Sequence, residues 1–188
     1  MKVHGRQSGL TLVEIMIAMV LAIIVMGAVI TIFVTTVKSS TENIRMVHLN
    51  QELRFVMGLM SDELKRAGYS ADPENDVFRD ALNWHAGSRC LRYAYDADGD
   101  GALVTDENLA FQAWPTDVPD RIRWGQGVTS NTCDDGVWED ITNPETALIG
   151  GFTITPDSAT VATVEVETIA VSITGSVDLI PGTATRTV

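Results

Sequence analysis

Twelve consecutive residues near the middle of this 188-residue chain have the spacing of a calcium-binding loop. Residues 96–107 read DADGDGALVTDE, which fits every constrained position of an EF-hand loop. In such a loop, side-chain oxygens, one backbone carbonyl and a final bidentate glutamate surround the ion. The expected ligands are Asp96, Asp98, Asp100, the carbonyl of Ala102, and Glu107.

The residues around this loop predict strands rather than the two helices of an EF-hand. Residues 90–95 read CLRYAY, a β-prone composition, and no long helical pattern follows Asn108. We therefore expect a loop between β elements and a structural role for calcium. An acidic surface turn that binds no ion is the alternative.

The two cysteines, Cys90 and Cys133, are expected to form a disulfide. Both follow the apolar segment at 10–37, and export of the downstream chain by that segment would bring them into an oxidising compartment. The bond would close a loop with 42 residues between the cysteines and stabilise the fold by about 4 kcal/mol. Two buried, reduced thiols are the alternative, and the absence of a CxxC motif argues against redox chemistry.

No group of residues predicts an enzyme. The three histidines, His4, His48 and His85, lie far apart in the sequence, and no triad or zinc motif is present. The four tryptophans are at positions 84, 114, 124 and 138. Core packing is the favoured interpretation for them, and an exposed binding surface stays open.

The elements that position these residues begin with an apolar segment at 10–37, in which Glu14 is the one ionisable residue. A helix of this length can span a bilayer. Lys2 and Arg6 precede it and favour a cytoplasmic N-terminus, so that the rest of the chain faces outward. Burial of a carboxylate in the bilayer costs about 2.5 to 3.5 kcal/mol, so Glu14 needs a partner.

An amphipathic helical pattern continues from this segment, so that one helix is expected over about 10–66, with Gly68 as its C-terminal cap. Its apolar stripe is expected to pack under a sheet rather than in a coiled coil. The stripe contains Met46, Leu49, Leu53, Val56, Met60, Leu64 and Ala67.

The remaining residues predict an acidic, mostly antiparallel β domain. Residues 67–188 contain six basic and twenty acidic residues, a formal charge of −14, which disfavours nucleic-acid binding. The apolar residues change phase after Val166, which predicts a bulge or a break near Glu167 and Thr168. Pro181-Gly182 predicts a closing hairpin between residues 176–180 and 183–188.

The segment Gly9-Leu10-Thr11-Leu12-Val13-Glu14, between a basic leader and an apolar run, resembles the prepilin signal of type IV pilin-like proteins. The resemblance implies that a prepilin peptidase cuts between Gly9 and Leu10 and that Leu10 is then N-methylated. It also implies that Glu14 pairs with the new amine of a neighbouring subunit. One departure is Thr31, which stands where many major pilins carry a proline.

The segment LNQELRFVMGLMSDELKRAGY at 49–69 resembles the helix end of the minor pilin PilW and, more distantly, of pseudopilin J of type II secretion. The expected fold is an α+β pilin fold with a cleaved leader at 1–9, a membrane or filament-core half-helix at 10–37, an amphipathic half-helix at 38–67 and a secreted head at 68–188.

These resemblances imply a minor pilin that primes or caps a type IV pilus. A type II secretion pseudopilin and a membrane-anchored, calcium-dependent adhesin are the alternatives. The implied partners are other minor and major pilins, the prepilin peptidase, the inner-membrane assembly platform and, before assembly, the membrane itself. The chain would cross the inner membrane once and later reach the periplasm, the pilus or the cell surface.

Overall fold

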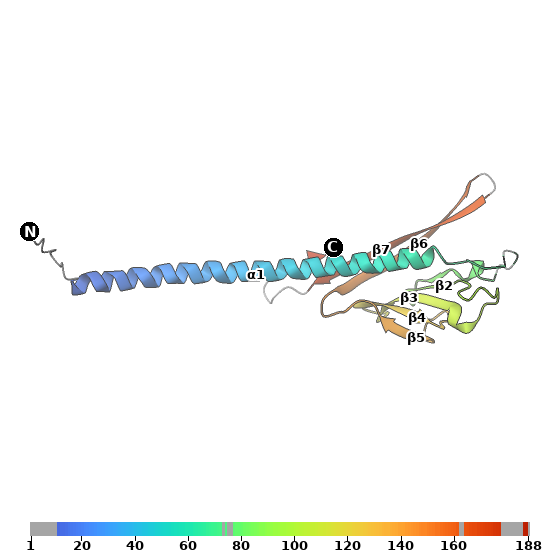
Figure 1. The fold of residues 1–188 in the computed structure, drawn as a ribbon, viewed down its shortest axis with the longest axis horizontal. Helices are drawn as coiled ribbons and strands as arrows, with labels where there is room; N and C mark the ends of the chain where they lie inside the picture. The colour runs from blue at the N-terminus through green and yellow to red at the C-terminus, as the bar shows by residue number, and fades with distance from the viewer. Residues whose placement is uncertain (1–10, 73, 75–76, 162–163, 178–185, 188) are drawn as a thin grey trace, which may run out of the picture. The chain divides into compact units, whose positions relative to one another are not determined.

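A computed structural model describes residues 11–72, 74, 77–161, 164–177 and 186–187. It has an α+β fold of one long helix, two short 3-10 helices and eight strands among those residues (Figure 1). The chain divides into two compact units, Met1–Asn43 and Ile44–Val188. The helix α1, Leu12–Leu64, supplies residues to both units, and each unit is described by itself below.

The first unit contains the apolar part of α1. The side chains of residues 11–40 are all exposed, as expected for residues that were predicted to contact lipid or neighbouring helices. Among the described residues, α1 is the one helix that is long and apolar enough to cross a membrane. It continues without a break past Thr31, where the chain has no proline to interrupt the helix.

In the second unit, the amphipathic part of α1 buries the predicted apolar stripe. Leu49, Leu53, Val56 and Met60 are buried and pack with residues of β2, β3, β4, β6 and β7 in one core. The charged residues of this part of the helix lie off the stripe, apart from Glu63, which is buried. Packing under a sheet, which was preferred to a coiled coil, is confirmed.

A five-stranded antiparallel sheet with the strand order β1-β2-β3-β4-β5 forms most of the head. Its strands are β1 Asn83–His85, β2 Cys90–Ala94, β3 Asn108–Trp114, β4 Arg121–Gln126 and β5 Val137–Asp140. The 3-10 helices η1, Arg79–Ala81, and η2, Thr105–Glu107, precede β1 and β3. Alternate residues such as Leu91 and Tyr93 face the core that α1 covers, whereas Cys90 packs in a second cluster with Val128 and Cys133.

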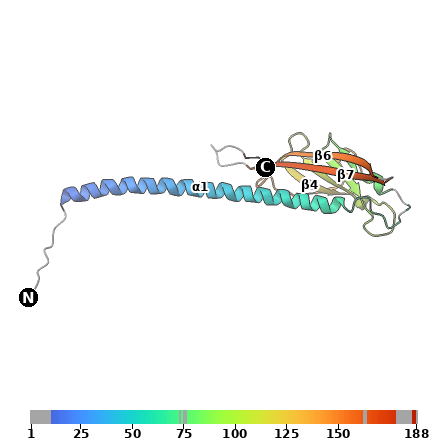
Figure 2. The same ribbon diagram turned by 90° about the horizontal axis from the view of Figure 1, so that it is seen from above.

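The second sheet has three antiparallel strands, β6 Leu148–Val161, β7 Val164–Val177 and β8 Arg186–Thr187. Figures 1 and 2 show β6 and β7 as one long hairpin beside the C-terminal part of α1. Pairing of β7 with β8 agrees with the predicted closing hairpin, whose turn lies outside the described residues.

The predicted bulge near Glu167 and Thr168 is wrong. These residues pair in continuous register with Ser158 and Asp157, and the register shift of this hairpin lies between Ile149 and Gly151 instead. Glycine weakens a strand interior and often marks an irregularity, and two glycines stand at 150–151.

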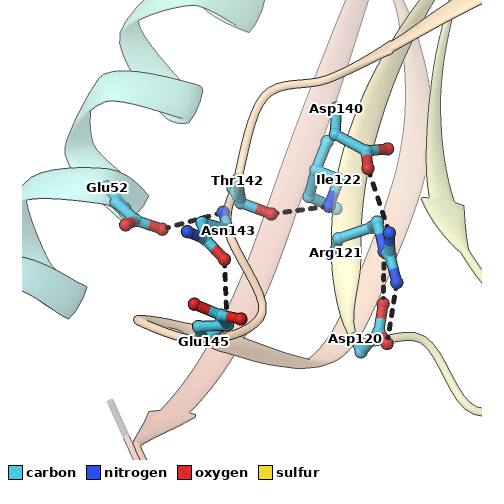
Figure 3. Close-up of polar contacts among 8 residues, drawn as sticks. All are labelled: Glu52, Asp120, Arg121, Ile122, Asp140, Thr142, Asn143 and Glu145. Carbon is cyan, nitrogen blue, oxygen red and sulfur yellow. Dashed lines mark hydrogen bonds and ion pairs between the residues drawn. The ribbon is translucent and has the colours of Figure 1, made fainter.

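A loop between β5 and β6 connects the sheet to α1 (Figure 3). The Glu52 carboxylate on α1 accepts a hydrogen bond from the Asn143 N–H at 3.4 Å and another from the Thr146 hydroxyl. The Thr142 hydroxyl accepts a hydrogen bond from the Ile122 N–H of β4 at 2.9 Å. These bonds fix the loop between the helix and the start of β4.

Candidate functional site

The N-terminal end of α1 carries the predicted assembly residues. Thr11 precedes the first helical residue, and its hydroxyl accepts a hydrogen bond from the Glu14 N–H at 3.3 Å, as an N-cap does. The Glu14 side chain is exposed and has no cationic partner among the described residues. The predicted cleavage site, between Gly9 and Leu10, lies outside those residues.

The hydroxyl groups within the apolar half of α1 are satisfied by the helix itself. The Thr31 hydroxyl donates to the Gly27 carbonyl at 2.9 Å, and the Thr36 hydroxyl donates to the Ile32 carbonyl at 2.8 Å. Such bonds allow threonine to lie in a bilayer or a dry helix bundle, where no water is available. Glu14 is therefore the group in this segment that still requires a partner.

The acidic loop at 96–107 brings three of its predicted ligands together. One carboxylate oxygen from each of Asp96, Asp98 and Glu107 lies within 4.8 Å of the other two. Asp96 and Glu107 are buried, and Asp98 is exposed. Asp100 is not in this group, and its Oδ1 accepts the Ala102 N–H at 2.7 Å.

Backbone N–H groups already point at the two buried carboxylates. Asp96 accepts hydrogen bonds from Ala71 at 2.9 Å, from Gly99 at 2.7 Å and from Gly101 at 3.1 Å. The Glu107 oxygens accept from the N–H groups of residues 97 and 104 at 2.7 and 3.1 Å. The hydrogen bond from Ala71, with those from Gly99 and Gly101, holds the pKa of Asp96 below its usual value.

The segment that follows α1 anchors this loop. Gly68 has the predicted left-handed conformation, with a φ of +79°, but its N–H donates to the Ala94 carbonyl at 2.8 Å and not to a carbonyl of α1, so it does not cap the helix as predicted. The Asp96 N–H then donates to the Tyr69 carbonyl at 2.9 Å. The helix itself ends at Leu64, two residues before the predicted end, because 3-10-type bonds tighten its last turn at Arg66 and Ala67.

The predicted disulfide between Cys90 and Cys133 is confirmed, with an S–S distance of 2.05 Å. It fixes the loop at 127–136 to the face of the sheet opposite α1. Arg92 also holds this loop, because its Nε donates to the Val128 carbonyl at 3.0 Å and its Nη1 donates to Asn131 Oδ1 at 2.8 Å. Sequence analysis missed Arg92, although its alternation with Leu91 and Tyr93 signals an outward position.

The tryptophans divide between the core and the outer face of the sheet. Trp84 and Trp124 pack against the main core, as predicted, and Trp138 packs on the smaller cluster beside the disulfide. Trp114 is 38% exposed. The Arg123 guanidinium lies over the rings of Trp114 and Trp138, at 3.9 and 4.2 Å from their centroids. Core packing therefore accounts for some of these rings and not for Trp114.

Two family models match the chain. The model described as prepilin peptidase-dependent protein B matches residues 42–188, which include the amphipathic part of α1 and the head. The model of the prokaryotic N-terminal methylation motif matches residues 4–30, which include Gly9, Leu10 and Glu14. No curated protein and no solved structure gave a significant match.

Proposed function

Because the chain belongs to the prepilin peptidase-dependent protein B family and carries the N-terminal methylation motif, we propose that it is a minor pilin that primes or caps a type IV pilus. In this proposal, a prepilin peptidase removes residues 1–9 and leaves Leu10 as the N-methylated terminus. A structural role of this kind needs no catalytic group. The chain is a single-pass inner-membrane protein before assembly and becomes part of the filament afterwards.

The observation that carries the proposal is the contrast between the two parts of α1. The side chains of residues 11–40 are exposed on every face of the helix, although most are apolar, whereas residues 49–60 bury a stripe against the head. So much apolar surface requires lipid or the helices of other subunits to cover it. Exchange of lipid for neighbouring pilin helices is the step by which a membrane-held subunit enters a filament.

Glu14 then sets the position of the subunit. Its carboxylate lies in the first turn of an apolar helix, where an unpaired charge is costly. Cleavage after Gly9 would create an amine on Leu10, and the amine of a neighbouring subunit would supply the missing opposite charge. The proposed pair forms only when the helix ends of two subunits meet in one register.

Substitution at Glu14 tests this assembly step. A strain that lacks the chromosomal copy is complemented with wild-type, Glu14→Ala or Glu42→Ala chains, and surface pili are sheared off and quantified. We expect Glu14→Ala to be processed and held in the membrane but to restore less than a tenth of the wild-type pili. Glu42→Ala is the control, because Glu42 is a half-buried carboxylate of the same helix that lies beyond the apolar segment, and it restores normal piliation.

The same strains separate a pilin from a type II secretion pseudopilin, which remains the second candidate because prepilin peptidases process both. Loss of secreted proteins with normal piliation in the deletion strain would assign the chain to secretion. Loss of pili with normal secretion assigns it to the pilus. The resemblance of residues 49–69 to PilW favours the pilus.

A calcium ion in the acidic loop is a separate proposal. The three converging carboxylates support it, and Asp96 Oδ1 and both Glu107 oxygens accept one N–H bond each and so keep further lone-pair capacity. Asp96, Asp98 and Glu107 would hold the ion directly, with Asp100 and the Ala102 carbonyl as the other ligands of the motif. The ion would stabilise the loop between β2 and β3 rather than act as a signal.

Thermal unfolding of the full chain in detergent tests the calcium proposal. For a millimolar site, 10 mM calcium would stabilise the fold by about 1.4 kcal/mol relative to a chelator, whereas magnesium would have little effect. Asp98→Asn is expected to abolish the difference. Asp106→Asn, which removes an exposed carboxylate outside the group, is expected to retain it. Equal melting temperatures with calcium and with chelator would contradict the proposal.

A further inference from the structure

The outer face of the five-stranded sheet contains an open pocket of about 780 Å³ that the assembly function does not use. It lies between the edge strand β1, the start of the β3–β4 connection and the loop at 127–136. Its volume is within the range of about 300 to 1,000 Å³ that is typical of small-molecule sites. The lining side chains on which its chemistry depends are Trp84, His85, Trp114, Arg123, Asn131 and Thr132.

The pocket wall formed by the loop at 127–136 is fixed before any ligand binds. The disulfide at Cys133 and the two Arg92 hydrogen bonds attach the loop to the sheet. The Asp135 carboxylate accepts hydrogen bonds from the N–H groups of Thr129 and Ser130, both at 3.0 Å. A wall fixed in this way lowers the entropy cost of binding.

The aromatic wall is also held in place. Arg123 lies between Trp114 and Trp138, and its Nε donates to Gln112 Oε1 at 2.9 Å. Gln112 is buried, and its Nε2 donates to the Ser88 carbonyl at 2.8 Å. The Arg123 guanidinium therefore already occupies the cation–π positions on the two indole rings, and a cationic ligand could not bind there.

The charges at the pocket favour an uncharged ligand. Arg123 and Asp134 are the lining residues with opposite formal charges, and burial, with the nearby Arg92, lowers the pKa of His85 and keeps its imidazole neutral at pH 7. Among the described residues, His85 Nε2 is a buried atom without a hydrogen-bond partner. A rotation of the His85 side chain that brings this nitrogen to the pocket surface would let a polar ligand supply the missing hydrogen bond.

We propose that this pocket binds a neutral sugar residue. A pyranose ring offers an apolar C–H face that can pack on Trp114 or Trp84 and hydroxyl groups that can bond to His85, Asn131 and Thr132. Anionic glycans fit less well, because Asp134 lies in the pocket and Arg123 is already bonded to Gln112. A minor pilin with such a pocket would present a glycan-binding site on its head.

The test measures binding by the full chain in a polyoxyethylene detergent, since a detergent with a sugar head group would compete. The probes are arrayed neutral oligosaccharides that end in glucose, galactose, mannose or N-acetylhexosamine, alongside sialylated and sulfated versions of the same chains. The variants are Trp114→Ala, which removes the exposed indole, and His85→Phe, which removes the buried nitrogen. Val118→Ala is the control, because Val118 is 75% exposed in the same connection and does not line the pocket.

We expect binding to at least one neutral glycan, with a dissociation constant that rises at least tenfold in Trp114→Ala and in His85→Phe and stays unchanged in Val118→Ala. Thermal unfolding shows whether either pocket variant has lost its fold. If one has, the binding of the other pocket variant decides between the outcomes. The proposal is overturned if no neutral glycan binds at millimolar concentration, if only charged glycans bind, or if a folded pocket variant binds as the wild type does.

Discussion

At the scale of single residues, Asp96 connects the acidic loop to the segment after α1. Its carboxylate accepts N–H bonds from Ala71, Gly99 and Gly101, which lower its pKa in the folded state below the ordinary value of 3.8. A lowered pKa contributes stability that is complete above the ordinary value and is lost as the pH falls through the folded-state value. Acid therefore weakens this connection below about pH 4.

Asp96→Asn tests this titration. With a chelator present to remove any calcium effect, we expect the variant to melt at a lower temperature than the wild type at pH 6. We expect the difference to shrink as the pH falls below 4, because the wild-type carboxylate is then protonated. Asp62→Asn is the control, since the Asp62 side chain is 70% exposed. A difference that stays constant from pH 6 to pH 3 would contradict the account.

Tyr93 connects β2 to α1 through a buried hydroxyl group. The hydroxyl donates to Glu63 Oε2 at 3.1 Å and accepts from Trp124 Nε1 at 3.0 Å, while Arg66 donates to Glu63 Oε1 at 2.6 Å. Burial, with the nearby Glu63, raises the pKa of Tyr93, so the hydroxyl stays protonated at any physiological pH.

Tyr93→Phe is expected to lower the free energy of unfolding by about 1 to 3 kcal/mol, because it removes the hydroxyl that bonds to the buried Glu63 and to the half-buried Trp124. Urea titration of the full chain in detergent measures the change. Tyr69→Phe serves for comparison, since Tyr69 is 59% exposed, and it changes the free energy little. Equal stability of Tyr93→Phe and the wild type would show that this network does not hold the helix to the sheet.

At the scale of elements, the close approach of β7 to α1 depends on Gly175. A Cβ at this position would lie 2.8 Å from Leu49 Cδ1 and 3.4 Å from Leu53 Cδ1. Gly58 on α1 has nothing within 4 Å of its Cβ position. Packing therefore requires a glycine at position 175, whereas position 58 has room for a larger side chain.

Replacement of each glycine by alanine separates these two cases. Gly175→Ala is expected to destabilise the fold by about 1 to 3 kcal/mol through overpacking. Gly58→Ala is expected to stabilise it by about 0.5 to 1 kcal/mol through helix propensity. Both are measured by urea unfolding at one pH. If Gly175→Ala is as stable as the wild type, β7 does not pack on the helix as closely as described.

The sequence predicted the elements best where one physical signal dominates. The apolar run and the stripe that follows it gave the course of α1 to within two residues at its C-terminal end, because hydrophobic periodicity is a local property. The two cysteines allowed one intramolecular pairing. The prediction of a bulge in β7 was wrong because the alternation of apolar residues shows which face of a strand is buried only where a core covers that strand. Ile169, Val171 and Ile173 pack against such a core.

The two candidate sites differ in how well the sequence predicted them, because a local pattern specifies one and not the other. The acidic loop is contiguous in sequence, so its spacing alone predicted a cluster that includes Asp96, Asp98 and Glu107. The pocket combines side chains from several strands and the loop at 127–136. The position of Arg123 between Trp114 and Trp138 depends on the register of β3, β4 and β5 together, which no local pattern specifies.

At the scale of the whole molecule, the proposed function requires the head to remain folded outside the cytoplasm. The disulfide closes a long loop of the unfolded chain and fixes the loop at 127–136 to the sheet. Replacement of Cys90 and Cys133 together by alanine is expected to cost about 4 kcal/mol of unfolding free energy. Denaturant titration of the full chain measures the loss. A double variant as stable as the oxidised wild type would leave the loop without a structural role.

The central claim is that the chain is a processed pilin subunit, and the mass of its N-terminal peptide tests that claim most directly. The chain is expressed with and without a prepilin peptidase, and the N-terminal peptide is identified by mass spectrometry. The account predicts a peptide that begins at Leu10 and carries one methyl group when the peptidase is present, and no such peptide in its absence or after Gly9→Val. A chain that keeps residues 1–9 beside a peptidase that cuts a known prepilin would contradict the account.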